Sequence, residues 1–288
     1  MFELATIEAE LAAQEARVPH LREGCEKQII WHDKPAKQTD LCVIYLHGFS
    51  ASGQEMRPLP DLVAQGLGAN LFLTRLTGHG QDGEAMGKAR LADWQADVAE
   101  ALEIGHTLGR EVIVMGCSTG CTLMTLALAE GAKARAVVYL SPNFGLRNWV
   151  GQTLLDFPGS RQWAKYIVGT HHRFKPRNAD HAAYWTLSYP NEAVHVMGDA
   201  LRAVRKADLS KITTPALFCY NERDKVVHPE RMRDVMGKWG DTTVVILLQQ
   251  TDADDPMGHI MAGEIQSPDQ TAPLAARILA WCQALPKQ

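Results

Sequence analysis

The sequence predicts an α/β fold: a doubly wound, mostly parallel sheet with helices on both faces. Short apolar segments alternate along the chain with longer segments of helical periodicity, which is typical of β-α-β units. The apolar segments are nearly continuous instead of alternating with polar residues, and this indicates strands that are buried on both faces. With 288 residues, of which 46% are hydrophobic and 22% charged, the chain can bury a full core.

The expected parallel strands are six short apolar segments rich in branched residues: 41–46, 69–73, 112–115, 136–140, 216–220 and 244–248. Residues 28–31 are a weaker candidate, which we expect to form an antiparallel strand ahead of them. Three intervals have helical patterns: 2–17, 91–108 and 119–130. The last of these stops at Gly131, a residue type that commonly ends helices.

One interval breaks this alternation of strands and helices. The stretch between Pro142 and Pro215 is far longer than the dozen or so residues that a crossover between parallel strands needs. We therefore expect an inserted lid. The expected division of the chain is an N-terminal helical segment, an α/β core in two pieces and the lid: 1–27, 28–142 with 211–288, and 143–210.

The insertion is rich in aromatic residues. They either form a small core of their own, or some of them also roof a pocket. Under the second interpretation the candidates for substrate binding are Phe144, Trp149, Trp163 and Trp185.

The insertion also contains a stretch, residues 157–179, that has several basic side chains and no acidic one. Arg173, Lys175 and Arg177 lie in it. One interpretation is that this stretch is a solvated basic face. The other is that it attracts anionic partners, either anionic substrates or, weakly, an anionic lipid surface.

Charge, hydropathy and cysteine content exclude several classes of protein. A formal net charge of −4 gives no sign of a basic face, so we expect no nucleic-acid partner. The longest apolar run, at 41–46, is far shorter than the ~18 residues of a membrane span. The N-terminus lacks the positive charge and apolar block of a signal peptide, which favours a cytoplasmic protein. The six cysteines are expected to be reduced, and without a Cys-x-x-Cys pair we expect no metal.

The clearest chemical signal is the pattern Gly-x-Ser-x-Gly at residues 116–120, between an expected strand and an expected helix. A strand that turns abruptly into a helix strains the residue at the turn, and its neighbours two positions away must lack side chains, hence Gly116 and Gly120. The turn lifts the hydroxyl of Ser118 out of the sheet, toward the N–H groups that begin the helix. We therefore expect Ser118 to be a nucleophile. The adjoining Cys117 is a poorer candidate, because the glycines would then lie at the wrong spacing.

A serine nucleophile needs a base, and the base needs a carboxylate that orients it. At a strand–turn–helix site of this kind, the acid and then the histidine follow the serine along the chain. Asp224 lies just after the expected strand 216–220 and is the preferred acid, with Glu222 as the alternative. His259, in the loop after the last expected strand, is the expected base. Three acids before it are expected in a solvated turn, unless one of them contacts the histidine: Asp252, Asp254 and Asp255.

A covalent mechanism at such a serine also needs two N–H donors for the oxyanion. The expected strand 41–46 is followed by His47, Gly48, Phe49 and a run of small residues, which let a backbone N–H approach the substrate. We assign the two donors to the backbone N–H groups of Phe49 and Thr119. We expect His47 to hold this loop, and a catalytic role for it is the alternative.

These motifs together resemble the α/β-hydrolase superfamily. The resemblance rests, in chain order, on His47-Gly48-Phe49, on the turn at 76–80, on the elbow at 116–120, and on Asp224 and His259. It spans residues 28–285. Within the superfamily the chain looks most like bacterial carboxylesterases and monoacylglycerol-lipase-like enzymes, although Thr77 stands where such enzymes usually have proline in the turn.

The resemblance implies an α/β-hydrolase fold and a serine esterase of lipase-like type. The implied reaction is hydrolysis of short to medium acyl or aryl esters, monoacylglycerol-like esters among them, through an acyl-enzyme and without a cofactor. The same triad can also cleave a C–C bond, a lactone or an amide. A binding module on an inactive hydrolase scaffold is the alternative from a different class.

Overall fold

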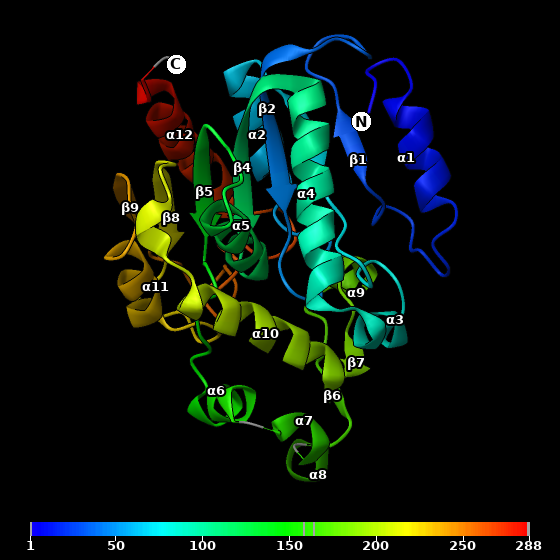
Figure 1. Cartoon of the computed structure of the whole chain (residues 1–288), viewed down its shortest axis with the longest axis vertical. Helices are drawn as coiled ribbons and strands as arrows, with labels where there is room; N and C mark the ends of the chain where they lie inside the picture. The colour runs from blue at the N-terminus through cyan, green and yellow to red at the C-terminus, as the bar shows by residue number, and fades with distance from the viewer. Residues whose placement is uncertain (1, 158, 164, 287–288) are drawn as a thin grey trace.

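The computed structural model describes residues 2–157, 159–163 and 165–286, and the side chains of 161, 163 and 165 lie outside the described part. One sheet dominates the molecule, with the strand order β1-β3-β2-β4-β5-β8-β9 (Figure 1). Its strands are β1 (Gln28–Ile30), β2 (Thr39–Leu46), β3 (Asn70–Leu73), β4 (Gly109–Cys117), β5 (Ala136–Leu140), β8 (Ala216–Tyr220) and β9 (Thr243–Leu247). Only β1 runs antiparallel to its neighbour among these strands. The predicted doubly wound parallel sheet is confirmed.

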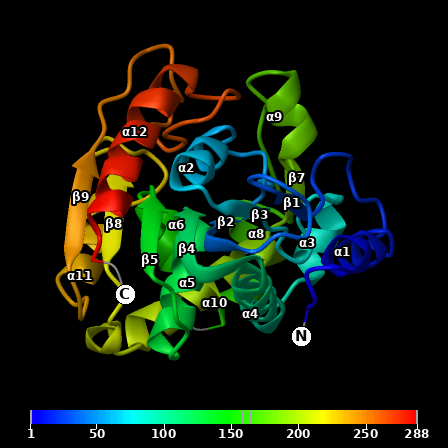
Figure 2. The ribbon, with the colours of Figure 1, turned by 90° about the horizontal axis from the view of Figure 1, so that it is seen from above.

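Helices cover both faces of the sheet (Figure 2). On one face lie α4 (Leu91–Leu108) and α5 (Thr119–Ala129), and on the other α2 (Leu59–Leu67) and α12 (Pro268–Ala284). Strand β2 shows how one apolar segment serves both cores: Ile44 packs into the first and Tyr45 into the second. Successive side chains of a strand point to opposite faces, so a continuous apolar run is what a doubly covered strand requires.

Two segments differ from the expectation. The N-terminal helix α1 covers only Ile7–Glu15, because the flanking residues form turns. Strand β9 is the sheet's edge, and its Val244, Val245 and Leu247 are exposed although the sequence there is as apolar as in the central strands. The apolar run predicts a strand correctly, but it cannot tell an edge strand from a central one.

The remaining helices of the core are short. They are α3 (Gly83–Lys88) and α11 (Pro229–Met236). Helix α3 begins at an N-cap, where the Asp82 side chain accepts a hydrogen bond from the Ala85 N–H.

The insertion lies between β5 and β8, at the carboxyl edge of the sheet (Figure 1). Its elements are α6 (Trp149–Asp156), α7 (Ser160–Trp163), α8 (Lys165–Val168), β6 (His171–Arg173), α9 (Ala179–Tyr184), β7 (Ser188–Pro190), α10 (Glu192–Lys206) and the 3-10 turn η1 (Leu209–Lys211). Strands β6 and β7 pair with each other as a separate two-stranded antiparallel sheet. Helix α10 packs along α5 and joins the insertion to the core.

Among the described residues of the insertion, buried aromatic side chains pack against the body of the protein. Trp185 packs against Ala51 and Ile265, and Tyr189 packs against Met86. These partners belong to the body of the protein, so the insertion is bound to the core through its aromatic residues.

The N-terminal segment also holds the insertion. The guanidinium of Arg22 donates to the backbone oxygen of Trp185 at 2.7 Å and to the hydroxyl of Thr186 at 3.1 Å. Gly24 lies so close to the insertion that a Cβ there would meet the Tyr184 ring at 2.9 Å. The base of the insertion is thus fixed from two sides.

All six cysteines are buried and free. Burial raises the pKa of the Cys219 and Cys42 thiols, and it raises that of Cys282 to about 12. Within the described residues, none of the helices is both long and apolar enough to span a membrane.

Candidate active site

Ser118 lies at the sharp turn between β4 and α5. Its backbone has φ 49° and ψ −110°, a region that residues with side chains rarely adopt. The turn is possible because its neighbours are glycines: a Cβ on Gly120 would lie 2.2 Å from the backbone oxygen of Leu46, and a Cβ on Gly116 would lie 3.0 Å from the Cys121 nitrogen. The Ser118 N–H donates to the Leu140 oxygen on β5, which fixes the turn to the sheet.

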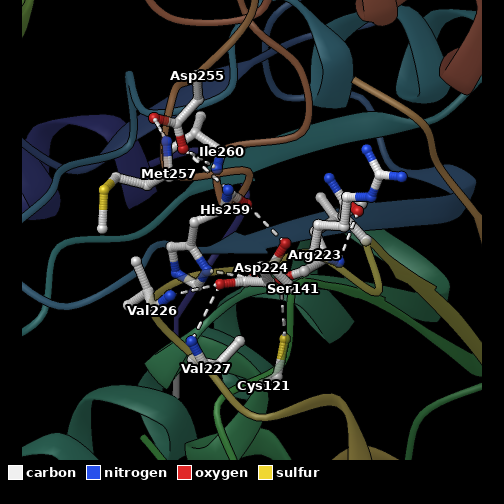
Figure 3. A network of polar contacts seen from close by, with 12 residues as sticks. Cys121, Ser141, Arg223, Asp224, Val226, Val227, Asp255, Met257, His259 and Ile260 are labelled. Carbon is white, nitrogen blue, oxygen red and sulfur yellow. Dashed lines mark hydrogen bonds and ion pairs between the residues drawn. The ribbon is translucent and has the colours of Figure 1, made fainter. Parts of the chain in front are cut away.

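Asp224 and His259 are brought together although 35 residues separate them in the chain. The Nδ1 atom of His259 lies 2.8 Å from Oδ2 of the fully buried Asp224. The other carboxylate oxygen accepts hydrogen bonds from the N–H groups of Val226 and Val227, at 2.7 and 3.0 Å (Figure 3). With Oδ1 occupied by two backbone N–H groups, Oδ2 is the oxygen placed to accept a hydrogen bond from Nδ1 of the imidazole.

Burial lowers the pKa of His259, but the Asp224 carboxylate more than offsets this, so the pKa lies above the ordinary value of 6.5. The carboxylates of Asp255 and Glu55 act in the same direction. The free Nε2 atom is therefore a stronger base than an isolated imidazole.

The loop that carries His259 is held by Asp255. One carboxylate oxygen accepts from the N–H groups of His259 and Ile260, at 2.9 and 2.8 Å (Figure 3). The hydroxyl of Ser141 donates to the His259 backbone oxygen at 2.6 Å. The expectation of a solvated acidic turn is therefore wrong for Asp255 and Asp254, which are both buried. The Asp255 side chain contacts the histidine at the histidine's backbone N–H.

The alternative acid, Glu222, points away from the site. It pairs with Arg233 at 2.7 Å, and both side chains are nearly half exposed. The alternative nucleophile, Cys117, is fully buried, and burial raises the pKa of its thiol. A protonated, inaccessible thiol is a poor nucleophile.

The two assigned oxyanion donors come from two segments that meet near Ser118, since Phe49 lines the same cavity as Ser118 and Thr119 follows Ser118 in the chain. Phe49 follows β2, and Thr119 is the first residue of α5. In the part of the chain that the structure describes, neither of their N–H groups has a hydrogen-bond acceptor. Two N–H groups that stay unpaired beside a nucleophile can bind a developing oxyanion.

His47 is buried in the loop that precedes Phe49. Its Nε2 accepts from the Leu76 N–H at 3.0 Å, and its Nδ1 lies 2.9 Å from the Gly48 oxygen. Burial lowers its pKa to about 4, so the ring is neutral at physiological pH. The structure thus places His47 in contact with the backbone of two loops.

A cavity of about 710 Å³ opens beside Ser118 and His259. Apolar side chains of the insertion line it, among them Leu146, Trp185 and Met197. The volume is in the range of sites for small organic ligands, and the mostly apolar lining fits an acyl or aryl group.

The four candidate aromatic residues of the insertion separate into different locations. Trp185 lines the cavity. Phe144 is instead buried against Tyr139 in the main core, and Trp149 is 76% exposed on α6, so neither is among the described residues that line the cavity. The backbone of Trp163 belongs to α7, but its side chain lies outside the described part of the chain. The sequence shows that these aromatic residues are grouped along the chain, but it does not show which surface each side chain faces.

Two acidic residues, one at the site and one outside it, have no sequence signal that marks them. Glu55 lines the cavity and is almost fully buried, and Asp97 accepts hydrogen bonds from both the N–H and the hydroxyl of Thr77. Their roles depend on contacts with loops far away in the chain. Among the described residues, no group of three or more metal-ligating side chains is placed to hold a metal ion.

The sheet order and the placement of these residues are typical of hydrolases built on a parallel α/β sheet. A model of the Alpha/beta hydrolase family matches residues 43–274, and the chain therefore belongs to this family.

Comparison with individual proteins agrees with the family. The chain is 29% identical over 188 residues to the thermostable monoacylglycerol lipase of Bacillus sp. (strain H-257), a match over 65% of this chain and 72% of that one. A metagenome-derived lipolytic enzyme superposes with a TM-score of 0.73 at 19% identity, over 91% of this chain and 99% of the other. The monoacylglycerol lipase of Paleococcus ferrophilus superposes with a TM-score of 0.63 at 13% identity, over 90% and 98%. The likeness to monoacylglycerol-lipase-like enzymes expected from the sequence is confirmed.

Proposed function

We propose that this chain is a serine hydrolase that cleaves carboxylic esters through an acyl-enzyme, with Ser118, His259 and Asp224 as its triad. The observation that carries the proposal is the 2.8 Å contact between the buried Asp224 and His259, which lines the same cavity as Ser118. The lipolytic activity of the relatives supports an ester as the substrate.

In this mechanism Nε2 of His259 takes the proton of Ser118 while the serine oxygen attacks the ester carbonyl. The Asp224 carboxylate holds the imidazole by Nδ1 and stabilises the imidazolium. The N–H groups of Phe49 and Thr119 bind the oxyanion. His259 then protonates the leaving alcohol, and a water molecule repeats the cycle on the acyl-enzyme.

The substrates are small esters with short to medium acyl or aryl groups, including monoacylglycerol-like esters. The size and the mostly apolar lining of the cavity support this range. The insertion at 143–210 acts as the lid over the site, because Leu146, Trp185 and Met197 extend from it into the cavity wall.

The first prediction concerns the nucleophile. Ser118→Ala is expected to lower turnover of a p-nitrophenyl ester series by about 10⁴- to 10⁶-fold, since it removes the attacking oxygen. A fluorophosphonate probe is expected to label wild type and Cys117→Ala and to leave Ser118→Ala unlabelled. The exposed-surface variant Ser210→Ala serves as the matched control and should behave as wild type.

Each result has a distinct meaning. Activity of Ser118→Ala within tenfold of wild type contradicts the mechanism. Labelling without ester turnover would favour the C–C bond, lactone or amide reaction of the same triad. A folded wild-type chain that is neither labelled nor active would favour a binding module.

A further inference from the structure

Glu55 is a buried acidic residue that the mechanism above does not use. It is 2% exposed and lies in the segment between β2 and α2, which carries the oxyanion donor Phe49. It also lines the cavity beside Ser118 and His259.

Two donors converge on one oxygen of the Glu55 carboxylate. The hydroxyl of Tyr45, on β2, donates to Oε2 at 2.9 Å, and the Gly48 N–H donates to the same atom at 2.8 Å. Cys117, the last residue of β4, is near enough for its thiol and this carboxyl group to influence each other's pKa. Gly48 immediately precedes Phe49, and Cys117 immediately precedes Ser118 and its neighbour Thr119.

The carboxylate is also packed tightly against the loop. A Cβ placed on Gly48 would lie 2.7 Å from Oε1 of Glu55, so the carboxyl group occupies the space that a side chain at position 48 would need. Burial raises the pKa of Glu55, whereas the hydrogen bonds from Gly48 and Tyr45 and the nearby Cys117 act against this. A buried carboxyl group is costly unless its oxygens are paired. Here the pairing joins β2 and the loop after it, and the end of β2 lies beside the end of β4, where Leu46 pairs with Gly116.

We propose that Glu55 is a positioning residue that connects the two backbone segments whose N–H groups bind the oxyanion. It holds the peptide at Gly48, and thereby the direction of the Phe49 N–H, in register with the turn at Ser118. This inference rests on the proposed ester-hydrolase function, because an oxyanion site is needed only for an acyl-transfer reaction.

A role in the oxyanion site predicts an effect on the transition state and not on substrate binding. Glu55→Ala and Glu55→Asp should lower kcat by about 10- to 100-fold, somewhat less than the loss of a whole oxyanion donor. The KM should stay within about twofold of wild type, because the cavity wall is otherwise unchanged. Glu55→Gln should keep kcat within about fivefold, since its amide oxygen accepts from Gly48 and Tyr45 as the carboxylate does.

A second readout separates positioning from general stability. An alkyl boronic acid forms a tetrahedral adduct on Ser118, so its affinity should fall in the Ala and Asp variants by the same factor as kcat/KM. The matched control is Glu15→Gln. Glu15 is another buried carboxyl group, bonded to Arg75 at 2.7 Å, but it is not among the described residues that line the cavity. This variant is expected to lower Tm and leave kcat and boronate affinity unchanged.

The outcomes are decisive even if one variant fails to fold. Folded Ala or Asp variants with wild-type kcat and boronate affinity overturn the proposal, and so does a Gln variant that loses as much as Asp. If the Ala variant does not fold, the order of kcat in Gln and Asp decides, with Gln above Asp as the expected result. If the wild type shows neither ester turnover nor labelling of Ser118, the proposed function itself is refuted. If the wild type is active but the Glu55 variants keep its kcat and boronate affinity, only the role of Glu55 is refuted.

Discussion

At the scale of single residues, the site is built by polar side chains that hold backbone groups in place. Asp224 accepts from two N–H groups and from His259, and Asp255 holds the peptide that carries the same histidine. Each carboxylate has its charge compensated by hydrogen bonds, so each can be buried next to a reacting centre. Such residues are rigid because they have several partners at once.

The raised pKa of His259 predicts a pH dependence of activity. The base acts only when neutral, so kcat/KM should fall as the pH decreases through the raised pKa, above the range of an ordinary histidine. Asp224→Asn removes the charge that raises this pKa. It should lower the plateau of kcat/KM by about 10⁴-fold and move the acidic limb to lower pH.

The measurement is kcat/KM for a p-nitrophenyl ester between about pH 5 and 9, a window that covers histidine titration. Glu222→Gln serves as the control, because Glu222 lies on the surface and pairs with Arg233. Its profile should coincide with that of wild type. An acidic limb that stays in place in Asp224→Asn would show that another group titrates.

The sequence marks some residues of the proposed site and leaves others unmarked. Ser118 stands out because its turn demands glycines at fixed spacing, and Asp224 and His259 stand out because they lie in the loops after two later strands of the same sheet. Glu55 could not be predicted, since its partners Tyr45, Gly48 and Cys117 come together only when two strands pair. The order of residues along the chain does not show which side chains from different segments meet in the fold.

At the scale of elements, the close approach of α5 to the end of β2 determines how the elbow is built. Gly120 faces the Leu46 backbone at a distance that admits no side chain, whereas Gly131, just beyond the same helix, has φ +101° and open space around it. The two glycines are therefore required for different reasons, one for space and the other for backbone conformation.

This contrast gives a prediction about stability. Gly120→Ala should lower the free energy of unfolding by about 3 kcal/mol, because the methyl group forces the helix away from the strand. Gly131→Ala should cost only about 1 kcal/mol, the strain of a left-handed conformation. Urea unfolding measures both changes, provided that the dependence of the unfolding free energy on urea concentration is the same in the variants and the wild type. An equal loss of unfolding free energy in the two variants would contradict the packing argument.

Another element shows why one departure from the family pattern is tolerated. Thr77, where the resemblance to the family leads one to expect proline, donates its N–H and its hydroxyl to the Asp97 carboxylate at 2.6 and 3.0 Å. Proline has no N–H to give. Burial raises the pKa of Asp97 to about 6, although both hydrogen bonds oppose this. The sequence reveals the departure, but the compensating acid lies on α4 and is visible only in the fold.

At the scale of the whole molecule, the insertion could be predicted from length alone, since no crossover needs so many residues. How it sits could not be predicted, because its contacts are with distant segments: Arg22 of the N-terminal segment binds its backbone, and Arg177 donates to the carbonyl oxygens of Ala253 and Gln266 near His259. Arg177 therefore ties the insertion to the loop of the proposed base.

The position of Lys175 predicts a preference for anionic substrates. Lys175 lines the cavity, whereas Arg173, two residues earlier on β6, is not among the described residues that do so. Lys175→Gln should raise the KM for an ester with a free carboxylate by about two- to fivefold, because this factor corresponds to the binding free energy that one exposed charge pair contributes. Neutral esters of the same length should be unaffected.

Arg173→Gln is the matched control, since it removes one positive charge from the same segment and should leave both KM values unchanged. Steady-state kinetics at low ionic strength give the comparison. An equal rise in KM for neutral and anionic esters, or the same effect from Arg173→Gln, would indicate a solvated basic face.

The burial of all six thiols has a consequence for how the folded chain meets electrophiles. Each sulfur is covered by packed side chains, and burial keeps its proton in place. Oxidants and alkylating agents thus find no reactive sulfur anion unless the whole fold opens. Ser118 is among the described residues that line the cavity and no cysteine is, so an electrophile that enters the cavity of the native protein can reach the serine oxygen but no sulfur.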